Sequence, residues 1–95
     1  MSMSTKLPES GIDAVGADTY TTIINGTARE CSSISIYCAT HPVIISLDDG
    51  TTDHIFVAAG VQQTFTGMVM PKGAVVQGKN GTAGQNYTAL TIAVW

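Results

Sequence analysis

The sequence predicts an all-β protein: a small antiparallel β-sandwich or jelly-roll-like barrel of about seven or eight strands with an extended N-terminal arm. Two observations predict this fold class. Short runs of β-branched residues recur from residue 19 onward, separated by turn residues at a spacing of roughly 8–12 positions. No window shows the period of an amphipathic helix. The length of 95 residues allows one domain at most.

The first 18 residues differ from the rest of the chain. They show no sustained hydrophobic period, and Pro8, Gly11 and Gly16 interrupt them. We therefore predict a flexible N-terminal arm over residues 1–18, ordered only where it contacts a partner, and a β-sandwich domain over residues 19–95. Removal of residues 1–16 should then leave the sandwich folded.

The expected strands follow in order from residue 19 to the end. Asn25-Gly26 ends the first, Pro42 opens the third because a strand's first residue need not donate to the ladder, and Gly60 follows the fourth. In the last strand, alternate residues point to opposite faces. The predicted ranges are 20–24, about 27–39, 42–47, about 53–58, 62–66, about 68–77 with a break at 71–73, and 87–95.

The segment HPVIISLDDGTTDHIFVAAG, residues 41–60, predicts two strands and their turn. A two-residue turn at Asp49-Gly50 would mix apolar and polar residues on each face. A three-residue loop at 48–50 instead makes one face uniformly apolar, so we favour that loop. The apolar face then holds Val43, Ile45, Leu47, Ile55 and Val57.

The aspartates of this segment raise the question of a cation site. Asp48, Asp49 and Asp53 offer hard oxygens close together, but they lack the alternating D-x-D-x-D-G pattern of a calcium loop. Turn residues that hydrogen-bond their own backbone are the favoured interpretation. His41 and His54 lack zinc-ligand spacing, so we expect no metal and no cofactor.

Catalytic motifs are also weak. The segment GAVVQGKN nearly matches a phosphate-binding loop, but Asn80 stands where a hydroxyl is required and no helix can follow. The serines around residues 32–35 lack a nucleophile elbow. The sequence therefore predicts a protein that is not an enzyme and has no catalytic residues, with a small hydrolase as the least favoured alternative.

Charge and cysteine content limit the classes of partner that the sequence predicts. Only 12% of residues are charged and the net charge is −3, which excludes the basic stripe of a nucleic-acid binder. No apolar run approaches the ~20 residues of a membrane span, and the start lacks a signal-peptide core. Cys31 and Cys38 would lie ~23 Å apart on opposite faces of one strand, so they cannot form a disulfide. Free thiols fit assembly in a reducing cytoplasm.

Exposed aromatic residues and the arm supply the candidate partner contacts. The four aromatic residues Tyr20, Tyr37, Tyr87 and Trp95 fit either a sugar-binding shelf or core and subunit-interface positions. We predict a partner-binding set drawn from the arm and these aromatics. Its members are Lys6, Leu7, Ile12, Val15, Tyr20, Tyr37 and Trp95.

The stretch from about residue 31 to 95 resembles small β-sandwich virion proteins of tailed bacteriophages, of the capsid decoration or cement type. The segments that carry the resemblance are VIISLDDG, HIFVAAG, PKGAVVQGKNG and NYTALTIAVW. It implies a homotrimer that binds the major capsid protein on the outer surface of a phage head and stabilises it, in a virion assembled in the host cytoplasm. The alternative is a carbohydrate- or receptor-binding module of a phage head fibre or tail.

Overall fold

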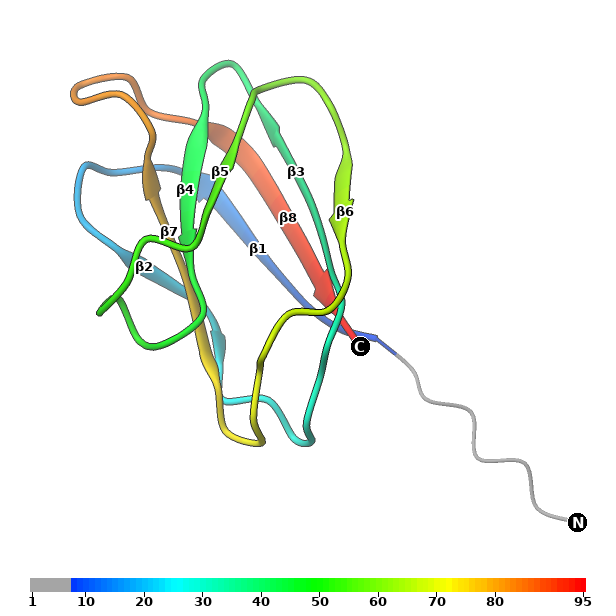
Figure 1. The fold of residues 1–95 in the computed structure, drawn as a ribbon. Coiled ribbons are helices and arrows are strands. Elements are labelled where there is room, and N and C mark those ends of the chain that lie inside the picture. The colour runs from blue at the N-terminus through cyan, green and yellow to red at the C-terminus, as the bar shows by residue number, and fades with distance from the viewer. Residues whose placement is uncertain (1–7) are drawn as a thin grey trace, which may run out of the picture.

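The computed structural model describes residues 8–95, which form eight β-strands and no helix (Figure 1). The all-β prediction is therefore confirmed for these residues. The strands are β1 Glu9–Val15, β2 Thr21–Asn25, β3 Ile34–Ala39, β4 Val43–Ser46, β5 Ile55–Val57, β6 Gln63–Phe65, β7 Val75–Asn80 and β8 Thr88–Val94.

The strands form two four-stranded antiparallel sheets. Sheet A has the order β1-β8-β3-β6 and sheet B the order β2-β7-β4-β5. Four antiparallel pairs join the first half of the chain to the second, namely β1 with β8, β2 with β7, β3 with β6, and β4 with β5. The chain is thus one long ribbon with the β4–β5 hairpin at its tip. The ribbon bends so that β3 also pairs with β8, and β4 with β7.

One hydrophobic core joins residues of both sheets, which face each other in Figure 1. Side chains alternate along β3 and β8, and every second residue of each strand enters the core. Each fully buried Ile, Leu or Val contributes roughly 1.5–3 kcal/mol to folding. The buried residues of these two strands are Ile34, Ile36, Cys38, Leu90, Ile92 and Val94.

The β4–β5 hairpin confirms the predicted apolar face but not the predicted loop. All five predicted residues of that face are buried, and Ile45 pairs with Ile55. The connection spans residues 47–54 rather than the three residues 48–50. Its tip is a turn at Asp49-Gly50, where both residues have positive φ (60° and 80°). Asp49 tolerates this left-handed conformation, so the chain turns there and not over three residues.

The N-terminal boundary differs from the prediction. Glu9–Val15 form β1, which pairs with β8 from Glu9↔Val94 to Val15↔Thr88, so the sheets begin ten residues earlier than residue 19. The pattern concealed this strand because its most apolar mid-strand residue, Ile12, points outward. Gly11 is required, since a Cβ there would lie 2.3 Å from the Ile23 carbonyl oxygen. The part of the predicted arm over residues 1–7 lies outside the described residues.

Two further predictions are wrong in detail. Residues 27–33 do not extend β3, and Cys31 makes an isolated bridge with Met70. Cys31 and Cys38 are therefore both buried in the core rather than on opposite faces, and neither forms a disulfide. The sixth expected strand also shifts, because β7 continues through Lys79 and Asn80, which were expected in a loop.

Candidate functional site

Three of the predicted partner-binding residues lie together on the outer face of sheet A. Ile12 pairs with Thr91, and Thr91 pairs with Tyr37, so these residues form one row across β1, β8 and β3. Trp95 follows the buried Val94 and exchanges backbone hydrogen bonds with Ser33. We call this surface the sheet A face and define it by Ser10, Ile12, Ser35, Tyr37, Thr64, Thr91, Ala93 and Trp95.

None of the side chains of the sheet A face carries a formal charge. Ile12 is 74% exposed and Tyr37 is 37% exposed, although both lie in regular strands. The polar members satisfy one another, since the Thr64 hydroxyl and the Gln62 amide both donate to the Ser35 hydroxyl. The face therefore offers apolar and neutral polar side chains, with no charged side chain to desolvate.

Two other predicted residues lie elsewhere. Val15 is exposed at the end of β1. Tyr20 lies beside sheet B, where its hydroxyl donates to Asp53 and the Lys79 ammonium lies 4.7 Å from its ring centroid. Burial and the hydrogen bond to Asp53 raise the pKa of Tyr20 above its ordinary value. Tyr20 is thus engaged within its own chain. Lys6 and Leu7 lie outside the described residues.

Tyr87 does not belong to an exposed aromatic shelf, because its side chain is completely buried. Its hydroxyl donates to Asp13 Oδ2 at 2.6 Å and to the Gly78 carbonyl at 3.3 Å. Burial and the hydrogen bond to Asp13 raise the pKa of Tyr87. The contact fastens β1 of sheet A to β7 of sheet B, so Tyr87 is a structural residue.

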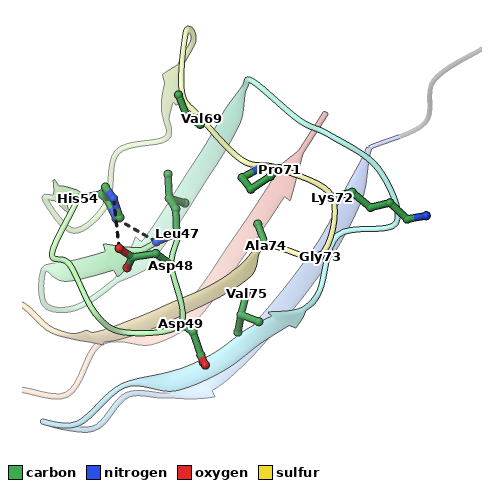
Figure 2. Close-up of a pocket in the computed structure, with 10 residues that line it drawn as sticks. All are labelled: Leu47, Asp48, Asp49, His54, Val69, Pro71, Lys72, Gly73, Ala74 and Val75. Atoms are coloured by element: carbon green, nitrogen blue, oxygen red, sulfur yellow. Dashed lines mark hydrogen bonds and ion pairs between the residues drawn. The ribbon is translucent and has the colours of Figure 1, made fainter.

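A hollow of about 600 Å³ opens between the β4–β5 connection and the segment that precedes β7 (Figure 2). We call it the loop hollow. Leu47 and Ala74 are buried at its base, and Val69 stands at its edge with 84% of its surface exposed. The lining residues are Leu47, Asp48, Asp49, His54, Val69, Pro71, Lys72, Gly73, Ala74 and Val75.

Asp48 is a carboxylate of the loop hollow that hydrogen bonds hold in place. Its Oδ1 accepts hydrogen bonds from the Ser46 hydroxyl and the Thr52 backbone N–H, both at 2.8 Å. Hydrogen bonds from the Thr52 side chain, Ser46 and the Thr52 backbone lower the pKa of Asp48 to about 2, with a smaller contribution from His54. Asp48 is therefore ionised at neutral pH.

His54 is held by two groups of the same loop. Its Nδ1 accepts the Leu47 backbone N–H at 3.1 Å, and its Nε2 lies 4.0 Å from Asp48 Oδ2. In the neutral ring the proton therefore sits on Nε2 and faces the carboxylate. A general base or a metal ligand needs a free nitrogen lone pair, and this tautomer presents none to the hollow.

The three aspartates considered as cation ligands do not converge. Asp49 accepts from the Gln77 amide at 3.2 Å, whereas Asp53 lies 3.3 Å from the Lys79 ammonium. Within residues 8–95, no group of three or more His, Cys, Asp or Glu side chains could hold a metal ion. The aspartates act as turn and pairing residues of the loop, each with a different partner.

Three exposed apolar residues, Phe56, Val61 and Val69, are not among the predicted candidate contacts. Val69 stands at the loop hollow, and Phe56 is 59% exposed beside a second hollow of about 220 Å³ on sheet B. The signal for Val69 was present in the sequence, because alternation with the inward Met68 and the buried Met70 turns it outward.

Comparisons with known proteins give no match: no family model, no curated protein and no solved structure matches the chain. Over residues 8–95, no helix is long and apolar enough to cross a membrane.

Proposed function

We propose that this chain is a structural virion protein, a capsid decoration or cement protein that binds the outer surface of a phage head as a homotrimer and stabilises it. The observation that carries this proposal is the sheet A face, which exposes Ile12 and Tyr37 without a formal charge. The core of a protein–protein interface is depleted in charged residues and enriched in aromatic ones, and this face has that composition.

We also propose that the fold is a jelly roll, and the strand pairing supports this. Pairing β1 with β8, β2 with β7, β3 with β6 and β4 with β5 describes one ribbon rolled into two four-stranded sheets. Eight-stranded double-sheet jelly rolls occur in viral capsid domains and also in lectin domains. The fold is thus compatible with the virion role and with the sugar-binding alternative.

The size of the sheet A face supports the oligomeric part of the proposal. Four strands span roughly 14 Å, and seven residues extend about 23 Å along a strand. Such a face is smaller than the ~800 Å² per partner of a standard interface. A single copy would therefore bind weakly. A trimer that presents three faces to a symmetric shell gains affinity through effective concentration, on the order of 10²–10⁴-fold.

Several further features fit this role. The two buried cysteines form no disulfide, which suits assembly in the host cytoplasm. The low charge suits a surface covered by protein rather than nucleic acid. His54 presents no free lone pair to the loop hollow, so this side chain does not favour a general base or a metal ligand there.

The sugar- or receptor-binding alternative is less well supported. It needs the tyrosines and Trp95 as a common shelf, but Tyr87 is buried and Tyr20 lies beside the other sheet. Tyr37 and Trp95 alone share a face. Binding of the isolated protein to a glycan array would reverse this preference.

Co-sedimentation with phage heads tests the proposal. Ile12→Glu places a charge on the sheet A face, whereas Phe56→Glu makes the same change at an exposed residue of sheet B. Burying an unpaired carboxylate is costly, so we expect Ile12→Glu to weaken capsid binding by roughly 100-fold or more and Phe56→Glu to leave it unchanged. Equal binding by both variants and the wild type would refute the sheet A face as the docking surface.

A further inference from the structure

We propose that the loop hollow binds residues 1–7 of a neighbouring copy of this chain. The inference rests on the proposed self-association, but it does not depend on binding to a capsid. It assigns the hollow an occupant of defined chemistry: a short chain segment with aliphatic side chains and one cation.

The apolar part of the hollow can accommodate aliphatic side chains. Leu47, Pro71 and Ala74 line it, and Val69 projects from its edge almost fully exposed. A valine with 84% of its surface in water contributes little to its own fold, and it gains by being covered. The exposed methyl groups of Val69 and the apolar base therefore form one surface that lacks a cover.

The polar part of the hollow is anionic. Asp48 is ionised, its side chain is 41% exposed, and its Oδ2 lies beyond hydrogen-bonding distance of His54 Nε2. A carboxylate has about four acceptor positions, so Asp48 can accept a further hydrogen bond from an ammonium group. Figure 2 shows the Lys72 side chain directed away from the hollow, and Asp49 accepts a hydrogen bond from the Gln77 amide, so Asp48 is the carboxylate that we expect a ligand to meet.

The first seven residues, MSMSTKL, match both parts. They carry three aliphatic side chains, Met1, Met3 and Leu7, together with the cation Lys6, and they contain no acidic residue. Met adapts to irregular apolar surfaces because its side chain is unbranched and flexible. An extended segment of seven residues spans at most about 25 Å, which is enough to reach from one subunit onto the next.

A contact of this kind is heterologous, because the segment of one copy meets a different surface on the next. Heterologous contacts close into rings when the rotation between neighbours allows it. The proposed homotrimer is such a ring. The segment and the hollow would then define the direction in which the subunits follow one another, while each sheet A face stays uncovered.

Solution mass is the first test, by analytical ultracentrifugation of four proteins. A variant that starts at Pro8 lacks the segment but keeps every described residue. Val69→Asp changes the hollow, and Val61→Asp is its matched control, because Val61 is 52% exposed and does not line the hollow. We expect the full chain and Val61→Asp to be trimers, and the truncated chain and Val69→Asp to be monomers with unchanged circular dichroism.

Peptide binding is the second test. A peptide of residues 1–8, MSMSTKLP, added to the truncated protein should shift the amide NMR signals of Leu47, Asp48, His54, Val69 and Ala74. The Lys6→Glu peptide should bind at least about ten-fold more weakly, because it places a carboxylate near Asp48. The wild-type peptide should also bind Val69→Asp at least about ten-fold more weakly.

Three results would overturn the inference. The truncated chain could keep the mass of the full chain, or the peptide could fail to bind. The peptide could also bind while the full chain is a monomer, which would mean that the segment occupies the hollow of its own copy. Co-sedimentation with heads separates this inference from the proposed function: a truncated chain that remains a trimer and still decorates heads would refute only the hollow contact.

Discussion

The outer surfaces of the two sheets differ although one ribbon forms both. The sheet A face is a row of neutral residues with Ile12 and Tyr37 exposed. Beside sheet B, Asp53 accepts a hydrogen bond from Tyr20 and lies 3.3 Å from the Lys79 ammonium. The charges of Asp53 and Lys79 therefore have partners within the molecule, whereas the sheet A face presents no charged side chain.

The β4–β5 connection explains this difference. It folds back over sheet B, so that Ser46 is completely buried although it lies on the outward side of β4. The Ser46 hydroxyl donates to Asp48 and accepts the Gly50 backbone N–H at 2.9 Å. On sheet A the corresponding hydroxyls of Ser35 and Thr64 bond one another on the surface. The β4–β5 connection thus covers part of the outer face of sheet B, whereas the sheet A face is not covered in this way.

Removal of β1 should have the largest effect on this arrangement. Deleting residues 1–16 removes the pairing with β8, the Asp13 partner of Tyr87 and the Gly16 N–H that bonds the Tyr87 carbonyl at 2.7 Å. We expect a loss on the order of 3 kcal/mol or more, a large part of a total of roughly 5–15 kcal/mol. Guanidinium unfolding followed by fluorescence would measure it.

The variant that starts at Pro8 is the matched control for this deletion: it keeps β1, so it should unfold at a higher midpoint than the chain that lacks residues 1–16. This prediction differs from the expectation from the sequence that the sandwich folds without residues 1–16, because β1 pairs with β8. Equal stability of the two truncated chains would show that β1 contributes nothing to sheet A, and it would restore the arm as first predicted.

Substitution of Tyr87 or Tyr20 should reduce stability less than removal of β1 does. Tyr87→Phe leaves Asp13 without its buried donor and should cost about 1–2 kcal/mol, whereas Tyr20→Phe, beside sheet B, should cost less than about 1 kcal/mol. Both phenols have a pKa raised above the ordinary value of 10.0. Their contribution to stability is therefore complete below pH 10 and is lost as the pH rises toward the raised pKa values.

Urea unfolding between pH 8 and 11 would check this prediction. The wild type should lose stability above about pH 10. Each single variant should lose less, and the double variant should lose least. If the double variant retained the full alkaline loss, neither tyrosine would be its source.

The smallest effect is expected in the loop that covers sheet B. The pKa of Asp48 is lowered from 3.8 to about 2, so its carboxylate stabilises the folded state above pH 4, and this contribution disappears as the pH falls toward 2. Asp48→Asn should flatten the stability profile between pH 4 and 2. Thr52→Ala removes the hydrogen bond that lowers the pKa of Asp48 most. The pKa of Asp48 should then lie closer to its ordinary value, and the stability lost between pH 4 and 2 should be smaller. An Asp48→Asn profile parallel to the wild type would contradict this assignment.

The strands that alternate in the usual sense could be predicted from sequence. In β8, Leu90, Ile92 and Val94 are buried as the pattern indicates, and the apolar face of the β4–β5 hairpin is correct for the same reason. In β1 the inward positions are Glu9, Gly11 and Asp13. Glu9 accepts the Ala28 N–H, Gly11 leaves room for the Ile23 carbonyl, and Asp13 accepts from Tyr87. These tertiary contacts determine the residue at each position, and they leave no hydrophobic period in the sequence.

The candidate sites also contain some features that the sequence predicts and others that only the fold shows. The sequence singled out Ile12, Tyr37 and Trp95 one by one, but only the pairing of β1 and β3 with β8 places them on one face. Asp48 and His54 were visible as neighbours in one segment. The loop hollow was not, because its opposite side comes from residues 69–75, and loop-to-loop packing leaves no local signal.

The pairing of the first strand with the last brings the two ends of the described chain side by side, with Glu9 opposite Val94 (Figure 1). Cargo fused to either end would therefore emerge from the same corner of the molecule. A short linker could also join the ends, and new ends could be opened at residues 81–86 without cutting a strand. Because the first and last strands are neighbours, the fold allows the ends of the chain to be placed in a different loop.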